Sequence, residues 1–259
     1  MKIKEIMTTD IISVDKDENL KHILSLMKKH NITKIPVVEN KIFIGIVTDN
    51  IIAYKLGSIR KRSISTSRLY ASSVIEKDVT TVSEDTDIKK ILQTVGQPGP
   101  TMLPVIKEQK LVGIITKADL LFLVDSTQPL NTIIQKNLHY VSPSDRVIHA
   151  RRIMIDENVA RLPVVDEGKL SGIISDIEIA FAFASLKKSF SIGRQKHKLD
   201  ELTVHSVMKS PVLWSTPTIT IKQAAKIMMK NSIGSLPILD DEELIGMVTR
   251  TDLLKTVSL

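Results

Sequence analysis

The stretch KIPVVENKIFIGIVTDN at residues 34–50 returns three more times along the chain, with the same residue types at the same spacing. In each copy a glycine follows the proline by nine residues, and a hydroxyl side chain follows that glycine by three. The other copies read MLPVIKEQKLVGIITKAD at 102–119, RLPVVDEGKLSGIISDIE at 161–178 and SLPILDDEELIGMVTRTD at 235–252. Chance does not produce two spacings shared by four segments, so the chain is built from four repeats.

The residues upstream of each proline predict a helix. An aliphatic residue stands sixteen positions before the proline in every copy, and it opens an apolar face of helical period. The third copy is weaker because Arg151 interrupts that face. Each repeat is therefore predicted to form a lead-in strand, a helix, two strands of Val and Ile joined by a turn, and a second helix. The fold class is α/β (α+β), with a small sheet and two packed helices per repeat.

Composition excludes several classes of protein. The chain has 259 residues, 42% hydrophobic and 25% charged, as in a globular protein, and 3% aromatic residues, so its core is aliphatic. The absence of cysteine excludes disulfides, iron–sulfur clusters and thiolate zinc sites. The six histidines lack ligand spacing, so no metal site is expected, and no phosphate-binding glycine loop or catalytic serine motif appears. A net charge of +7 favours a phosphate-bearing partner.

No membrane-crossing or targeting segment is visible. The first ten residues lack the apolar run of a signal peptide, and the apolar run at 42–47 is far shorter than a membrane span. The sequence therefore predicts a cytoplasmic protein.

The spacing of the repeats predicts two halves. The prolines are 68, 59 and 74 residues apart, so the first and third gaps hold extra residues. These residues form two connectors, near 54–72 and 187–199, which are rich in Lys and Arg and contain no acid. We expect them to be either solvated loops or surfaces that face a ligand or a polyanion. With a boundary near Ser126–Asn131, the predicted modules are residues 1–126 and 127–259.

The repeated phrase resembles the CBS domain. It consists of Pro, then Gly, two apolar residues and Thr or Ser, with an acid following. The resemblance covers nearly the whole chain in four copies, and each half resembles a Bateman module, so it implies two pseudo-symmetric modules. Such modules commonly bind adenine nucleotides (AMP, ADP, ATP or S-adenosylmethionine) in clefts between paired repeats. They regulate another protein, catalyse nothing themselves and need no catalytic cofactor.

The resemblance also implies which residues bind. In the family the acid three residues after the hydroxyl accepts hydrogen bonds from both ribose hydroxyls, a task suited to an ionised carboxylate. Repeat 1 has Ile51 at the acid position, and repeat 3 has Glu178, which is one methylene longer. Two repeats carry the complete pair, namely Thr116 with Asp119 and Thr249 with Asp252.

The partner repeat is expected to supply a phosphate-binding cation from the position two residues before its proline. Lys34 of repeat 1 would serve the Asp119 site, and Arg161 of repeat 3 would serve the Asp252 site. The equivalent residues of repeats 2 and 4 are uncharged. By the same resemblance, backbone groups near Ile12 and His139 would hold the adenine.

Each of these residues also has a purely structural interpretation. Asp119 and Asp252 could cap the helix that follows, and Glu178 is expected to be a surface or capping acid. Lys34 and Arg161 could be solvated surface cations. Tyr140 and Trp214 stand at matching places on lead-in strands, where we expect core packing.

The leading hypothesis is a stand-alone regulatory protein that binds a nucleotide and acts on an unidentified protein target. The alternative is a nucleic-acid-binding protein that uses the basic connectors, although aromatic residues are scarce. An enzyme is a third hypothesis, disfavoured because the repeats occupy almost the entire chain. The two modules could lie side by side, or two chains could form a homodimer.

Overall fold

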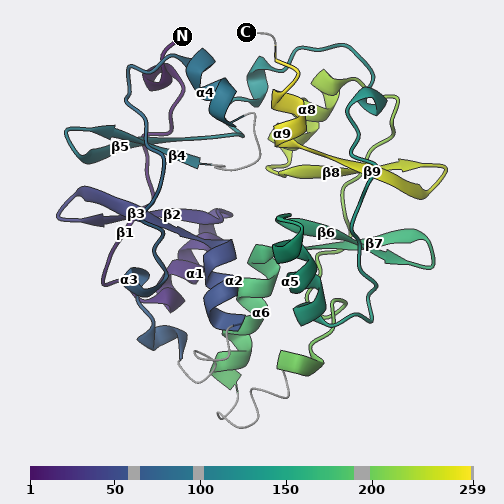
Figure 1. Cartoon of the computed structure of the whole chain (residues 1–259), viewed down its shortest axis with the longest axis horizontal. Helices are drawn as coiled ribbons and strands as arrows, with labels where there is room; N and C mark the ends of the chain where they lie inside the picture. The colour runs from purple at the N-terminus through teal and green to yellow at the C-terminus, as the bar shows by residue number, and fades with distance from the viewer. Residues whose placement is uncertain (58–64, 96–101, 190–198, 258–259) are drawn as a thin grey trace. The chain divides into compact units, whose positions relative to one another are not determined.

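The computed structural model describes residues 1–57, 65–95, 102–189 and 199–257 and is a mixed α/β structure. The predicted fold class is confirmed, as is the order of helix, strand and strand within each repeat (Figure 1). The predicted lead-in strand is β1 in repeat 1 and an isolated bridge in the other repeats, and a 3-10 turn replaces the second helix in repeat 2. Repeat 1 contains β1 (Val14–Asp15), α1 (Leu20–His30), β2 (Lys34–Glu39), β3 (Ile42–Thr48) and α2 (Asp49–Gly57). Repeat 2 contains α4 (Ile88–Val95), β4 (Met102–Lys107), β5 (Lys110–Thr116) and the 3-10 turn η4 (Leu121–Leu123).

Repeats 3 and 4 follow the same order. Repeat 3 contains α5 (Val147–Asp156), β6 (Arg161–Asp166), β7 (Lys169–Ser175) and α6 (Asp176–Ser189). Repeat 4 contains α8 (Ile221–Lys230), β8 (Ser235–Asp240), β9 (Glu243–Thr249) and α9 (Arg250–Leu254). Short helical turns precede some repeats: η1 (Ile3–Glu5), η3 (Thr66–Arg68), α3 (Ala71–Val74) and η5 (Leu130–Thr132). Within the described ranges, no helix combines the length and the apolar character needed to cross a membrane.

The four hairpins share one geometry. In the first, Asn40 and Lys41 connect the strands with φ angles of 51° and 67°. Two successive positive φ angles define a type I′ turn, whose twist matches that of an antiparallel pair. The turns at 108–109, 167–168 and 241–242 have positive φ at both positions as well. Each hairpin also has a register shift beside the residue paired with the repeat's glycine, so all four hairpins have the same bulge.

The chain divides into two compact units, each with its own apolar core. The odd unit, residues 12–79 and 139–212, contains the strands and main helices of repeats 1 and 3. The even unit, residues 1–11, 80–138 and 213–259, contains those of repeats 2 and 4. Each predicted module, 1–126 and 127–259, contributes one repeat to each unit, and the assignment of modules stays a prediction.

Neighbouring repeats exchange their opening segments. Residues 1–11 precede repeat 1 but pack in the even unit on repeat 2, where Thr8 bridges to Ile114. Conversely, Glu76 from the start of repeat 2 bridges to Ile46 of repeat 1. Repeats 3 and 4 make the equivalent exchange, through the bridges Gln135–Met247 and Lys209–Ile173. Each repeat is therefore completed by a segment that belongs to its neighbour in sequence.

The glycine of the repeated phrase makes room for that segment. A Cβ atom on Gly246 would lie 2.0 Å from Cγ2 of Ile134 and 2.8 Å from the carbonyl oxygen of Gln135. A Cβ atom on Gly45 would lie 2.3 Å from the carbonyl oxygen of Glu76. A real Cβ cannot approach backbone so closely, so these positions need glycine for the crossing segment to pair with the strand.

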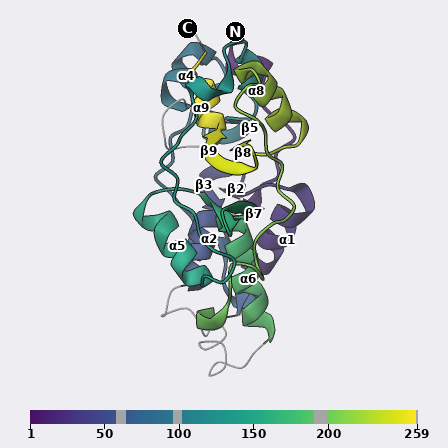
Figure 2. The same ribbon diagram turned by 90° about the vertical axis from the view of Figure 1, so that its right-hand side faces the viewer.

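The two second helices of the odd unit pack against each other. Figure 1 shows α2 beside α6, and Figure 2 shows α1 and α5 on either side of this pair. Phe183 of α6 is 1% exposed. Its ring packs so closely on Gly57 of α2 that a Cβ atom added to Gly57 would lie 2.8 Å from the ring. Arg151 of α5, which interrupts the apolar face predicted for that helix, donates from Nε to the carbonyl oxygen of Ala53 at 3.3 Å. Its guanidinium also stacks over the ring of Tyr54, 5.6 Å from the centroid.

Candidate functional site

The complete motif of repeat 2 forms a compact clamp. Thr116 ends β5, and both its backbone N–H and its Oγ1 hydroxyl donate to Oδ2 of Asp119, at 2.7 and 2.8 Å. Asp119 is half-buried, and its Oδ1 accepts no hydrogen bond from the residues that the structure describes. The clamp thus fixes one carboxylate oxygen and leaves the other able to accept bonds from a ligand.

The motif of repeat 4 forms the same clamp with one addition. The backbone N–H and Oγ1 of Thr249 donate to Oδ2 of Asp252 at 2.8 and 2.6 Å, and the pair forms a capping box at the start of α9. The capping interpretation is therefore correct for Asp252. Its Oδ1 accepts a hydrogen bond from Nε2 of Gln135 at 3.1 Å, and the residue is 7% exposed. The two clamps consequently differ in how accessible their second oxygen is.

Repeat 3 reproduces the clamp with a glutamate. The backbone N–H of Ser175 donates to Oε2 of Glu178 at 3.1 Å, and the Ser175 hydroxyl donates to the same oxygen. The longer side chain thus reaches the position that aspartate occupies in repeats 2 and 4. This contact at the start of α6 fits the capping role expected for Glu178.

Repeat 1 has no clamp. Oγ1 of Thr48 accepts from the backbone N–H of Ile51 at 3.2 Å, which caps the first turn of α2. Because Ile51 has no carboxylate, Thr48 serves only this structural purpose in the described contacts. The incomplete motif therefore forms an ordinary helix start.

Both predicted cations lie in the odd unit, on the strands that carry the repeated proline. Lys34 pairs with Thr48 in the β2–β3 register, and Arg161 pairs with Ser175 in the β6–β7 register. The positive charges of both side chains act on Asp49, the first residue of α2. The structure therefore brings the two cations to a common carboxylate. The clamps of Asp119 and Asp252 belong to the even unit, so the assembly of each complete site stays a prediction.

Two acids accompany these cations, and sequence reasoning gave neither a role. Burial raises the pKa of Asp49, an effect that Lys34 and Arg161 oppose. Burial, and then the charge of Asp49, raises the pKa of Asp176 to about 6. A hydrogen bond from Nδ2 of Asn50 to Oδ2 of Asp176, 3.1 Å long, opposes that rise, as does the charge of Arg151. Burial also lowers the pKa of the Arg161 guanidinium.

The predicted adenine contacts offer unpaired backbone groups. The backbone N–H and C=O of Ile12 and His139 form no hydrogen bond within the part of the chain that the structure describes. Such groups can pair with the edge of a base. The His139 ring itself is exposed, and its Nε2 lies 3.3 Å from Oε2 of Glu157.

The expected core positions of Tyr140 and Trp214 are wrong. Tyr140 is 60% exposed and Trp214 is 50% exposed. The next residues, Val141 and Ser215, form the lead-in bridges and are buried, and side chains of an extended chain alternate between faces. The aromatic side chains consequently face outward.

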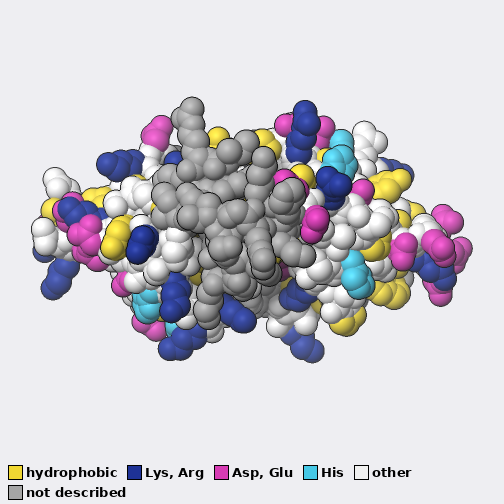
Figure 3. Space-filling model, turned by 90° about the horizontal axis from the view of Figure 1, so that it is seen from below, with side chains coloured by type: hydrophobic (Ala, Val, Ile, Leu, Met, Phe, Trp, Pro, Cys, Tyr) yellow, Lys and Arg dark blue, Asp and Glu magenta, His cyan; other side chains and the backbone are white. Residues whose placement is uncertain are grey.

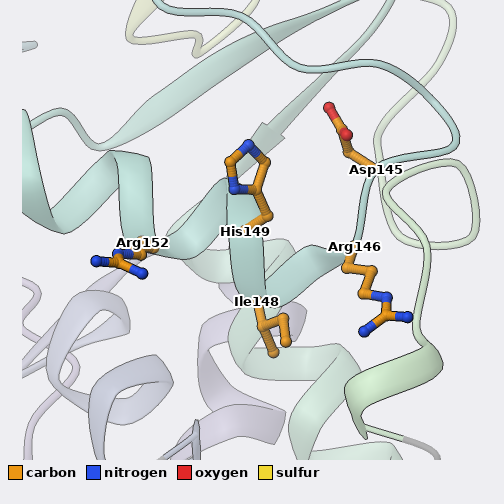
Figure 4. Close-up of a pocket in the computed structure, with 5 residues that line it drawn as sticks. All are labelled: Asp145, Arg146, Ile148, His149 and Arg152. Atoms are coloured by element: carbon orange, nitrogen blue, oxygen red, sulfur yellow. The ribbon is translucent and has the colours of Figure 1, made fainter.

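Two surface pockets lie away from all these residues. One, of about 480 Å³, is lined by the start of α5 and the residues before it, and Figure 4 shows its five labelled side chains spreading in different directions. The other, of about 410 Å³, is lined by Lys16, Glu39, Ile44, Ser72, Ile75 and Lys77. Since no predicted site residue lines either pocket, neither supports a convergent binding site. Among the described residues, no group of His, Asp and Glu side chains could hold a metal ion.

The basic connectors lie partly outside the described residues, at 58–64 and 190–198. On the face drawn in Figure 3, the Lys and Arg side chains of described residues stand among Asp and Glu side chains and form no continuous basic patch. The described residues on this face therefore add no support for nucleic-acid binding.

Comparison with known proteins identifies the repeat. The CBS domain matches residues 3–57, 71–126, 130–185 and 204–259. The uncharacterized protein MJ1404 of Methanocaldococcus jannaschii is 26% identical over 266 residues, and the match covers 99% of this chain but only 62% of MJ1404. The uncharacterized protein MJ1225 of the same organism is 25% identical over 265 residues, covering 95% of this chain and 94% of MJ1225.

Solved structures share the fold over the full length. The crystal structure of MJ1225, proposed as an archaeal homolog of g-AMPK, has a TM-score of 0.86 at 24% identity and covers 100% of both chains. An uncharacterized conserved protein from Pyrococcus horikoshii has a TM-score of 0.61 at 22% identity, again covering 100% of both chains. At these identities the likeness concerns the fold.

Proposed function

Because the chain belongs to the CBS-domain family and carries four copies of the domain, we propose that it is a regulatory protein that binds adenine nucleotides. The ligand is AMP, ADP, ATP or S-adenosylmethionine, held by paired repeats. The proposed first site combines Thr116, Asp119, Lys34 and Ile12, and the proposed second site combines Thr249, Asp252, Arg161 and His139.

The observation that carries this proposal is the clamp of Thr116 on Asp119. The threonine occupies Oδ2 with two donors and leaves Oδ1 without a partner among the described residues. A ribose offers two adjacent hydroxyl donors, and bonds from hydroxyls to an ionised carboxylate are stronger than bonds between neutral groups. The fixed carboxylate suits that diol because little rotamer freedom is lost on binding.

The second site should bind more weakly than the first. Gln135 already donates to Oδ1 of Asp252 at 3.1 Å, so a ribose hydroxyl must share that oxygen or displace the amide. Breaking the hydrogen bond from Gln135 to Asp252 costs enthalpy, and binding at Asp119 has no such cost. The two sites are therefore expected to fill in order, the Asp119 site first.

Binding would act through the arrangement of the repeats. A ligand shifts an equilibrium between two arrangements only to the extent that it binds them with different affinity. We propose that a protein target recognises the shifted arrangement, and that the chain catalyses no reaction of its own.

Isothermal titration calorimetry with AMP, ADP, ATP and S-adenosylmethionine tests the proposal on protein stripped of copurified ligand. Asp119→Asn keeps the size of the side chain but removes its charge, and it should weaken the tighter site at least about tenfold. Asp252→Asn should weaken the second site, while Asp125→Asn, at an exposed position, should change neither. Absence of heat with all four ligands in folded wild-type protein would refute nucleotide binding.

A further inference from the structure

Two acids of the odd unit follow the strands that pair with the cation-bearing strands, and their charges interact with the cations proposed to bind phosphate. Asp49 begins α2, and its backbone N–H donates at 2.9 Å to the carbonyl oxygen of Thr33, the residue before Lys34. In repeat 3, the backbone N–H of Asp176 donates at 3.3 Å to the carbonyl oxygen of Ala160, the residue before Arg161. The same backbone geometry thus sets the start of the second helix, and the acid that it carries, against the start of the cation-bearing strand in both repeats.

The fold does not require acids at these positions. The equivalent residues, directly after the hydroxyl of the motif, are Lys117 in repeat 2 and Arg250 in repeat 4. Acids therefore occupy this position only in the two repeats that carry Lys34 or Arg161. The match between acid and cation is a property of the odd unit rather than of the repeat.

The arrangement is unfavourable for the carboxylates themselves. Asp176 is 3% exposed and Asp49 is half-buried, and two carboxylates near each other raise the free energy of the doubly ionised state. Asn50 from α2 donates a hydrogen bond to Asp176. The positive charges of Arg151 from α5 and Lys34 from β2 act on the same carboxylate. Arg161 interacts with both aspartates and with Glu178. Asparagine at position 176 would avoid the cost of the charge, and a carboxylate with a strongly raised pKa beside charged partners is a candidate functional group.

We propose that Asp49 and Asp176 are shared counter-ions that neutralise Lys34 and Arg161 in the empty protein and compete with the phosphate of an incoming ligand. The proposal rests on the function proposed above. A phosphate that reaches either cation adds negative charge beside both carboxylates, which then hold a proton more strongly. Phosphate binding is consequently coupled to proton uptake, and the two cation-bearing sites are coupled through one pair of acids.

The pKa of about 6 for Asp176 sets the range in which this coupling operates. Well above that value Asp176 is ionised and competes with the phosphate. Well below it, the carboxyl group is neutral and no longer opposes an anion at Lys34 or Arg161. The competition therefore weakens as pH falls through about 6.

Titration calorimetry with AMP and ATP at pH 7.5 and pH 5.0 tests the proposal. We expect Asp176→Asn and Asp49→Asn to bind about tenfold more tightly than wild type at pH 7.5, since each removes a negative charge near the cations. For Asp176→Asn the ratio of the dissociation constants should approach one at pH 5.0. Comparing variants at one pH cancels the titration of the ligand phosphate. Asp17→Asn, at an exposed position, is the matched control.

Unchanged affinity in both variants, with wild type binding normally, would overturn the counter-ion role. A second measurement separates this proposal from the proposed function, because it needs no ligand. Carbon-13 NMR titration of the Asp176 carboxyl in empty protein should show its pKa rising when Lys34→Met or Arg161→Met removes a positive charge. No shift in either variant would overturn the proposal, whereas failure of nucleotides to bind to any variant would overturn the proposed function instead.

Discussion

At the scale of single residues, Asp176 gives the protein a stability that depends on pH. Burial raises the pKa of Asp176 to about 6, from an ordinary value of 3.8, so the folded state holds a proton that the unfolded chain releases. The free energy of unfolding attributable to this group therefore falls as pH rises from about 4 to about 6, and it stays low above that range.

Asp176→Asn should remove this dependence. The variant is expected to be more stable than wild type by about 2–3 kcal/mol at pH 7.5, with the difference vanishing near pH 4. Urea denaturation at pH 4.5, 6.0 and 7.5 measures it, with Asp17→Asn as the exposed control. A difference of the same size at every pH would mean that Asp176 does not titrate in this range.

The local arrangement of two motif pairs could be predicted, while their role in binding stays a prediction. The family resemblance selected Asp119 and Asp252, which stand three positions after a threonine, and the structure shows both carboxylates accepting hydrogen bonds from that threonine. Glu178 takes the capping role expected for it, but side-chain length in isolation did not tell that its carboxylate would occupy the position of the aspartates in repeats 2 and 4. The grouping of Asp49 and Asp176 into one cluster was missed because it depends on packing between repeats 1 and 3, which are distant in sequence.

At the scale of elements, the exchanged segments depend on the glycines of the repeated phrase. Gly246→Ala would place a Cβ 2.0 Å from Ile134 and 2.8 Å from the backbone of Gln135, so the crossing segment must move away from β9. We expect the variant to lose about 2–3 kcal/mol of stability in urea denaturation. Gly168→Asn is the control, because Gly168 has a φ of 82° and open space around it. Equal stability of Gly246→Ala and wild type would contradict the described crossing.

The strands were easier to predict than the second helices. Runs of Val and Ile between turn residues located all four hairpins. The second helices, however, differ in length, with α6 covering 14 residues and η4 only 3. The difference follows from their surroundings: α2 and α6 lengthen where they pack on each other, whereas the segment after Leu123 runs into Asp125 and Ser126, which favour turns.

At the scale of the whole molecule, repeats 1 and 3 share a core although they lie in different halves of the sequence. Periodicity describes local structure and carries no information on which apolar faces meet. The sequence could therefore predict four repeats and their internal order, but not that α2 would pack on α6.

A fragment of residues 1–126 should therefore form a dimer. It retains α2 but lacks α6, so the apolar side chains of Ile52 and Leu56, both 0% exposed in the full chain, would face water. A second copy can cover them with its own α2, in a symmetric contact. Size-exclusion chromatography with light scattering measures the mass, and Leu56→Glu should keep the fragment monomeric. A stable, cooperatively unfolding wild-type monomer would contradict this prediction.

The exchange of opening segments also constrains how such a chain is synthesised and how its gene can change. The hairpin of repeat 1 can form its bridge from Ile46 to Glu76 only after residues 71–79 have left the ribosome. Deletion of a single repeat would leave one opening segment without a strand to pair with. It would also leave the glycine of one repeat without the segment that packs against it. Duplication and deletion are thus tolerated two copies at a time, and an even number of repeats is the expected state.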